Sequence, residues 1–174
     1  MINPADLKKH VIIPVLQKLD RSSDSAIKLI LGTAAQESAM GFHLAQMAGG
    51  PAKGIYQMET ATHADIWKNY LAYYQIIRTE VKNLLITKLY DSSYFMSNKG
   101  TLIEYPSALE MCGNLYYATA MCRVFYFRVK EPLPKANDIA GMAHYWKTYY
   151  NTAQGKGTEE EFIANYKKFQ IDKI

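Results

Sequence analysis

The sequence predicts a predominantly α-helical fold with a small extended component, built as one domain over residues 1–174. Apolar side chains recur at helical spacing in several stretches, and residues with capping chemistry precede most of these stretches. Hydrophobic residues make up 49% of the chain and charged residues 21%, which is typical of a globular protein with one sizeable core. We expect six to eight helices around a central buried helix, with an irregular or extended segment near residues 41–58.

The N-terminal quarter predicts two helices. Asn3-Pro4 starts the first, because proline is tolerated in a first turn, and Pro14 should kink or split it. Ser22, Ser23 and Asp24 offer caps for the second helix. Its apolar face repeats at helical spacing in Ile27, Ile30, Leu31 and Ala34. Glycines then interrupt the pattern, and residues 54–58 are expected to form a short strand or extended segment.

The middle of the chain predicts a long helical region that continues to about Tyr90 and leaves room for one break. Thr62 and Asp65 resemble a capping box at its start. Residues 91–106 then predict a loop or a small hairpin.

A central helix is predicted from Ser107 toward Arg128, with Ser107 and Glu110 as its capping box. Residues 112–127 are apolar nearly all round, which indicates burial on every side. If this stretch is one helix, Cys112 and Cys122 are about 15 Å apart along its axis. That separation is too large for a disulfide, so we expect two small buried hydrophobic side chains.

Two more helices are predicted toward the C-terminus. Pro132 and Pro134 separate the central helix from a helix that begins near Asn137 and ends near Tyr150. Thr158 and Glu161 then form a third capping box before a last amphipathic helix that reaches about residue 169.

Several functional classes lack their sequence signals. The net charge is +4 but no dense basic run occurs, so nucleic-acid binding is not expected. The four histidines are scattered and fit no zinc spacing, and no nucleophile elbow or phosphate-binding loop occurs, so neither a metal nor a cofactor is expected. No stretch reaches the roughly 18 apolar residues of a membrane span, and the N-terminus lacks a signal-peptide pattern.

Glu37 is the candidate catalytic acid. It lies at the edge of the apolar face of the second helix, in its last turn, where a carboxyl group is poorly hydrated. Desolvation disfavours the charged form and should raise the pKa of Glu37. A carboxylic acid that stays protonated near neutral pH can donate a proton to a leaving group, as glycoside cleavage requires.

Three motifs in order resemble the soluble lytic transglycosylases and goose-type lysozymes of the lysozyme-like superfamily. Glu37-Ser38 at a helix end is similar to the catalytic Glu-Ser of that family, and Gly54-Ile55-Tyr56-Gln57-Met58 is similar to its Gly-Leu-Met-Gln segment. The later Ala-Tyr-Asn-Ala-Gly segment is matched imperfectly by Tyr150-Asn151-Thr152-Ala153, or in another register by Tyr145. Tyr56 also departs from the family, which usually has methionine there. The resemblance covers roughly residues 25–157 and implies a lysozyme-like α+β fold.

The resemblance implies cleavage of the β-1,4 bond between MurNAc and GlcNAc in peptidoglycan glycan strands, with Glu37 as general acid. Glu59 and His63 occupy places where goose-type lysozymes have an Asp and a His, so Glu59 is a candidate second carboxylate and His63 a candidate sugar contact. A hydrolase would use Glu59 to orient water, whereas a transglycosylase needs Glu37 alone and closes an anhydro ring. The alternative is that Glu59 is a solvated residue before a helix and His63 a first-turn residue.

The remaining site candidates each have a structural alternative. Gln57 and Tyr56 either line the substrate cleft or fix the loop and fill the core. Ser38 either bonds Glu37 or ends the helix. Tyr145, Tyr150 and Asn151 either contact the acid and substrate or pack within the protein.

The whole-chain pattern is also similar to phage- or prophage-encoded members of the superfamily. This implies synthesis in the bacterial cytoplasm without a signal peptide and delivery to the cell wall by a virion or a holin-type route. It also implies an alternative function, in which the domain is an inert structural or adaptor protein that contacts phage tail or virion proteins.

Overall fold

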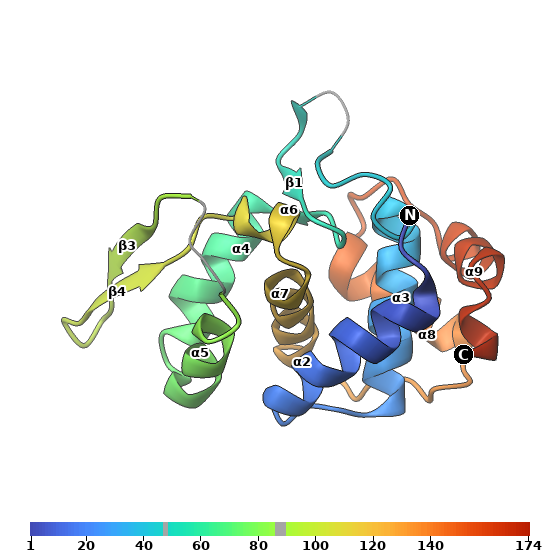
Figure 1. The fold of residues 1–174 in the computed structure, drawn as a ribbon, viewed down its shortest axis with the longest axis horizontal. Helices are drawn as coiled ribbons and strands as arrows, with labels where there is room; N and C mark the ends of the chain where they lie inside the picture. Colours follow the sequence, from blue (N-terminus) through green and yellow to red (C-terminus); the bar gives the residue numbers. More distant parts are fainter. Residues whose placement is uncertain (47–48, 86–89) are drawn as a thin grey trace.

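A computed structural model describes residues 1–46, 49–85 and 90–174. The chain is mostly helical, with two small antiparallel sheets of two strands each (Figure 1). When contiguous α and π segments are counted together, the described residues form eight helices. The predicted fold class, a mostly α fold with a small β component, is confirmed. No helix in the described ranges is long and apolar enough to cross a membrane.

The first helix is continuous but not regular. It comprises α1 (Pro4–Leu7), a π-helical segment η1 (Lys8–Ile12) and α2 (Ile13–Lys18), and Asn3 caps its start. Proline lacks an N–H and crowds the preceding turn, so the regular α ladder is interrupted where Pro14 follows η1. The expected split therefore occurs in the hydrogen-bond pattern, while the helix continues.

Helix α3 (Asp24–Ser38) carries Glu37. Ser23 caps it as predicted, accepting a 3.1 Å hydrogen bond from the Ala26 N–H. Gly32 lets α3 approach α9, because a Cβ at this position would lie 2.4 Å from the Phe162 ring. The helix ends where Ala39 adopts a left-handed conformation.

The irregular segment after α3 contains a two-stranded sheet. Strand β1 (Ala52–Lys53) pairs with β2 (Met58–Glu59), so that Ala52 lies opposite Glu59. The expected extended stretch at 54–58 is mostly the turn between these strands rather than a strand. Residues 47–48 of the predicted irregular segment lie outside the described residues.

The predicted long helical region is broken once and ends at Lys82 instead of continuing to about Tyr90. It consists of α4 (Thr60–Ile66), the π segment η3 (Trp67–Leu71) and, after a turn, α5 (Gln75–Lys82). The capping box expected at Thr62 and Asp65 is wrong, because α4 begins at Thr60 with Glu59 as its N-cap. Residues 86–89 of this region lie outside the described residues.

The hairpin expected within residues 91–106 is present. Strand β3 (Ser93–Met96) pairs with β4 (Leu102–Tyr105), and the hairpin projects from the side of the molecule that carries α4 and α5 (Figure 1).

The predicted central helix is two helices. Helix α6 (Glu110–Gly113) ends at Asn114, whose side chain caps α7 (Leu115–Phe127) by accepting from the Tyr117 N–H. The expected capping box at Ser107 and Glu110 is wrong, because α6 begins only at Glu110. Both cysteines are free thiols, Cys122 buried and Cys112 partly exposed.

The C-terminal elements are α8 (Ile139–Tyr145), the π segment η4 (Trp146–Asn151), α9 (Glu159–Lys168) and the 3₁₀ turn η5 (Ile171–Lys173). Asp138 rather than Asn137 caps α8, and the predicted capping box of Thr158 and Glu161 is confirmed.

Helix α7 forms the middle of the core. It contacts α4 and α5 on one side and α2 and α3 on the other (Figure 1). Nine of its side chains are buried, which confirms the central buried helix that the apolar run predicts. Helix α9 packs along α3 and α8. The end of α3 that carries Glu37 thus packs among α7, η4 and α9.

Candidate active site

Glu37 is the penultimate residue of α3, and its side chain is partly exposed. The helix stops after Ser38 because Ala39, Met40 and Gly41 all have positive φ. The Glu37 side chain therefore sits in the last turn of a buried helix, as the sequence predicts.

The Glu37 carboxylate accepts a 2.8 Å hydrogen bond from the indole Nε1–H of Trp146. Burial raises the pKa of Glu37 to about 7, and the Trp146 hydrogen bond opposes this rise because it stabilises the charged form. Desolvation dominates, so a substantial fraction of Glu37 is protonated near neutral pH.

The environment of Glu37 is built from α7 and η4. Burial raises the pKa of Cys122, Tyr126 and Tyr150, and the nearby Glu37 charge adds to the rise in each case. These groups bring no cation to the carboxyl, so nothing among them offsets the cost of ionising Glu37.

Ser38 joins the end of α3 to the segment after β1. Its buried hydroxyl donates a 2.6 Å hydrogen bond to the Ile55 carbonyl and accepts one from the Gly41 N–H at 2.8 Å. Ser38 therefore holds Glu37 beside the 54–57 turn. The buried hydroxyl is bonded to the backbone, which fits the expectation that Ser38 ends the helix rather than the expectation that it bonds Glu37.

Tyr150 joins η4 to the same turn. Its hydroxyl donates a 2.7 Å hydrogen bond to the Tyr56 carbonyl, across 94 residues of sequence. The Tyr150 ring also stacks on Tyr126 of α7 with centroids 5.3 Å apart. Together with the Trp146–Glu37 bond, these contacts close a ring of hydrogen bonds that links the end of α3, the 54–57 turn and η4.

The 54–57 turn depends on unusual backbone conformations. Gly54 has a φ of +73°, and a Cβ there would lie 2.5 Å from the Met111 carbonyl oxygen, so only glycine fits. Gln57 has a φ of 45°, and its amide donates to the Gly54 carbonyl at 2.8 Å. This bond fixes the partly exposed Gln57 side chain to its own turn.

Glu59 and Asn151 lie at the edges of this arrangement. Glu59 is exposed at the end of β2, where it forms the N-cap position of α4 without a side-chain capping bond. Asn151 ends η4, and its side-chain oxygen accepts a 2.7 Å hydrogen bond from Lys147. Neither side chain is hydrogen-bonded to Glu37.

Three predicted substrate contacts are buried instead. Tyr56 is 2% exposed and its hydroxyl bonds Thr119, and Tyr145 is 5% exposed and donates to the Glu131 carbonyl. His63 is 1% exposed, and its Nε2 lies 2.6 Å from the Tyr117 hydroxyl. The sequence left both a substrate-contact role and a structural role open for these side chains, because the motif gives their order in sequence and not the face of the chain that is buried.

Trp146 is the site residue that sequence reasoning missed. It is fully buried, stacks on Phe162 of α9 at 5.3 Å and lies four residues before Tyr150. The indole one helical turn before the Tyr150-Asn151 motif is the feature of the sequence that could have identified Trp146 as a site residue. Trp146 is held by the packing of α8 and η4 against α9.

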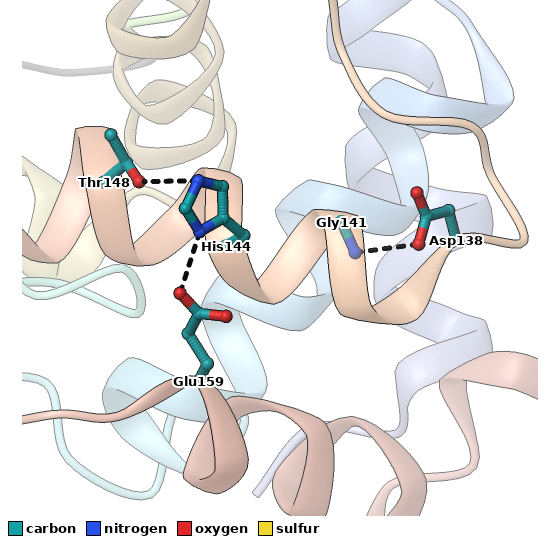
Figure 2. Close-up of polar contacts among 5 residues, drawn as sticks. All are labelled: Asp138, Gly141, His144, Thr148 and Glu159. Carbon is teal, nitrogen blue, oxygen red and sulfur yellow. Dashed lines mark hydrogen bonds and ion pairs between the residues drawn. The ribbon is translucent and has the colours of Figure 1, made fainter.

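Figure 2 shows the surface contacts at this junction. His144 of α8 bonds Glu159 in the first turn of α9 at 2.9 Å, and Asp138 caps α8 through the Gly141 N–H at 2.8 Å. An exposed pair such as His144–Glu159 contributes little stability, so the buried Trp146–Phe162 stack is the main support of the indole.

Within the described ranges, no group of three or more histidine, cysteine or acidic side chains is close enough to hold a metal ion. Comparison of the chain with protein-family models, with curated proteins and with solved structures finds no match.

Proposed function

We propose that this protein cleaves the β-1,4 bond between MurNAc and GlcNAc in peptidoglycan glycan strands, with Glu37 as general acid. The observation that carries the proposal is the ring of hydrogen bonds around Glu37. Three segments that resemble the lysozyme-like motifs in sequence are joined in space by Ser38 to Ile55, Tyr150 to Tyr56 and Trp146 to Glu37. These bonds place the end of α3, the 54–57 turn and η4 next to one another, which supports a common site that includes the Glu37 carboxyl.

The chemistry follows from the pKa of about 7 at Glu37. The protonated carboxyl donates its proton to the glycosidic oxygen while the bond from that oxygen to the anomeric carbon breaks. Glu37 is then a carboxylate and can accept a proton from the attacking nucleophile. That nucleophile is water in a hydrolase and the sugar's own 6-hydroxyl in a lytic transglycosylase.

Glu59 separates the two mechanisms. As a second carboxylate it would activate water, and it is the acidic residue of the 54–59 segment. The Glu59 side chain is exposed to solvent, and no hydrogen bond orients it toward Glu37. Mass spectrometry of the products distinguishes the mechanisms, because reducing ends identify a hydrolase and anhydro-muramyl ends a transglycosylase.

The test is clearing of purified peptidoglycan by the wild type and by Glu37→Gln. We expect Glu37→Gln to lose activity by about 10²–10⁴-fold or more, because it cannot donate the proton. Glu160→Gln is the matched control, since Glu160 is an acidic residue in the first turn of α9 and should retain full activity. Circular dichroism checks that both variants fold. A wild type that clears nothing between pH 4 and 8, or an active Glu37→Gln, contradicts the proposal.

A second candidate function is an inert lysozyme-like structural or adaptor protein of a phage virion. The projecting β3–β4 hairpin favours it, because Tyr94, Met96 and Leu102 are each at least 60% exposed on this hairpin. Exposed apolar groups of this kind are common at protein–protein contacts. In this case no peptidoglycan is cleared, and the hairpin variant Met96→Lys should weaken assembly with virion proteins. Both candidate functions include a phage origin, with delivery by a virion or a holin-type route.

A further inference from the structure

Two arginines meet on one aromatic ring at the end of the molecule remote from Glu37. Arg21 lies in the turn after α2, and Arg123 lies within α7. Their guanidinium carbons are 4.4 and 5.4 Å from the centroid of the Phe127 ring. Helix α3 begins three residues after Arg21, and Glu37 is about 20 Å further along its axis. The arginine pair is therefore separate from the candidate active site.

Arg123 is a buried cation without an acidic partner. Its side chain is 7% exposed, and its Nε donates a 3.1 Å hydrogen bond to the Arg21 carbonyl. In the part of the chain that the structure describes, no carboxylate lies within ion-pair distance of Arg123. The charge of the neighbouring Arg128, in contrast, is paired in the usual way, through a 2.6 Å ion pair with Asp65.

Arg21 is also incompletely compensated. Its Nε is buried and has no hydrogen-bond partner among the described residues. Its nearest carboxylate is that of Asp20, which is fully exposed and 3.6 Å away, so the pair is weak. Two guanidinium groups thus share one ring with little negative charge beside them.

This arrangement is costly without an anion. A buried charge is normally paired, because loss of hydration is otherwise uncompensated. Burial lowers the pKa of Arg123, and the charge of Arg21 lowers it further. Burial raises the pKa of the nearby Tyr70, whereas the charges of Arg21, Arg128 and Arg123 oppose that rise, so the Tyr70 phenol lies beside the same cluster.

We propose that Arg21 and Arg123 bind an oxyanion of the phosphate class at this end of the molecule. Planar guanidinium groups donate paired hydrogen bonds to phosphate oxygens, and two of them suit a group with three or four oxygens better than a carboxylate with two. The Phe127 ring lies within cation–π distance of both guanidinium groups and so holds them near each other. The source of the phosphate is either a free phosphorylated solute or a phosphate held in a lipid headgroup.

The first test measures thermal unfolding against inorganic phosphate, with sodium chloride adjusted to keep the ionic strength constant. We expect a saturable increase in Tm for the wild type, because a ligand that binds only the folded state stabilises it. Arg123→Gln and Arg21→Gln should each raise the phosphate dissociation constant by about tenfold or more. Lys9→Gln removes one exposed positive charge elsewhere and should bind phosphate as the wild type does.

Arg123→Lys tests whether phosphate binding needs the guanidinium group or only its positive charge. Lysine keeps the charge but not the paired donors, so its phosphate affinity should lie well below that of the wild type. If Arg123→Gln fails to fold, the partly exposed Arg21→Gln carries the same test. A Tm that does not respond to phosphate, or that responds equally in Arg21→Gln and the wild type, overturns the proposal.

Sedimentation with vesicles identifies the source. Binding to phosphatidylglycerol vesicles that is lost in Arg21→Gln but kept in Lys9→Gln assigns a lipid phosphate. A phosphate-dependent Tm without such vesicle binding assigns a free phosphorylated solute. Acetate at the same concentration should not shift the Tm, and an equal shift by acetate contradicts the phosphate class.

Discussion

The indole Nε1–H of Trp146 donates a 2.8 Å hydrogen bond to the Glu37 carboxylate, although the two residues are 109 positions apart in sequence. The bond joins the C-terminal end of α3 to the start of η4. It is the one side-chain hydrogen bond described at a carboxyl whose burial raises its pKa to about 7. Trp146 therefore sets how far desolvation can raise the Glu37 pKa.

Trp146→Phe should raise the Glu37 pKa further. The variant removes the donor that stabilises the carboxylate, while the phenyl ring keeps much of the buried surface. The basic limb of the pH–activity profile should move to higher pH, and a carbon NMR titration of the Glu37 carboxyl should show the same direction without any need for activity.

Trp67→Phe is the matched control for Trp146→Phe. Trp67 is also fully buried, but its indole donates to the Tyr117 hydroxyl instead of a carboxylate. Both variants should lose stability, and only Trp146→Phe should shift the Glu37 titration. An unchanged Glu37 pKa in a folded Trp146→Phe protein contradicts the assigned role of the indole.

Glu37→Gln should change the pH dependence of stability. A carboxyl with a raised pKa in the folded state costs stability as the pH rises from its unfolded value near 4.5 to about 7. Relative to the wild type, Glu37→Gln should therefore gain on the order of 3 kcal/mol between pH 4 and pH 8. Urea unfolding of both proteins across this range measures the difference, and a constant difference would count against a raised pKa.

His63 should produce the opposite slope. Burial lowers the pKa of His63 to about 4, so its neutral form is favoured in the folded protein. Its contribution to stability is present above pH 6.5 and is lost as the pH falls toward 4. Between pH 7 and pH 5 the wild type should lose on the order of 1–2 kcal/mol relative to His63→Phe.

The Glu37 and His63 effects overlap in pH, so each is measured as a difference from its own variant. His10→Phe is the control for His63→Phe, because His10 is exposed. Its stability should follow the wild type across the range. A His63→Phe protein that runs parallel to the wild type would show that the His63 pKa is not lowered in the folded state.

Gly54→Ala should destabilise the 54–57 turn. The alanine Cβ would meet the Met111 carbonyl oxygen at 2.5 Å in a left-handed backbone conformation. Gly100 has a nearly identical φ of +72° with open space around it, so Gly100→Ala measures the backbone cost alone. We expect about 1 kcal/mol for Gly100→Ala and at least about 2 kcal/mol for Gly54→Ala in urea unfolding. Equal losses would refute the close contact with Met111.

The sequence predicted the features that a few neighbouring residues encode. Ser23 and the Thr158–Glu161 pair satisfy N–H groups within one helical turn, so their caps were predictable. The apolar run of α7 predicted burial on all sides of this helix, whichever elements pack against it. The break at Asn114 was missed because the Ser107 and Glu110 pattern offered an earlier start, although Asn114 is itself a good cap.

Glu37 was also predicted locally, because helical spacing placed it at the end of a buried face. The partners of Glu37 were decided only by tertiary structure. Trp146 contacts the end of α3, and Tyr150 contacts the 54–57 turn, because η4 packs on α7 and α9. These contacts join residues far apart in sequence, so no local pattern predicts them. Likewise His63 and Tyr56 point inward because α7 offers them the hydroxyls of Tyr117 and Thr119. Local sequence thus determined where the acid lies, and long-range packing determined which groups tune its pKa, because desolvation and hydrogen bonding depend on residues distant along the chain.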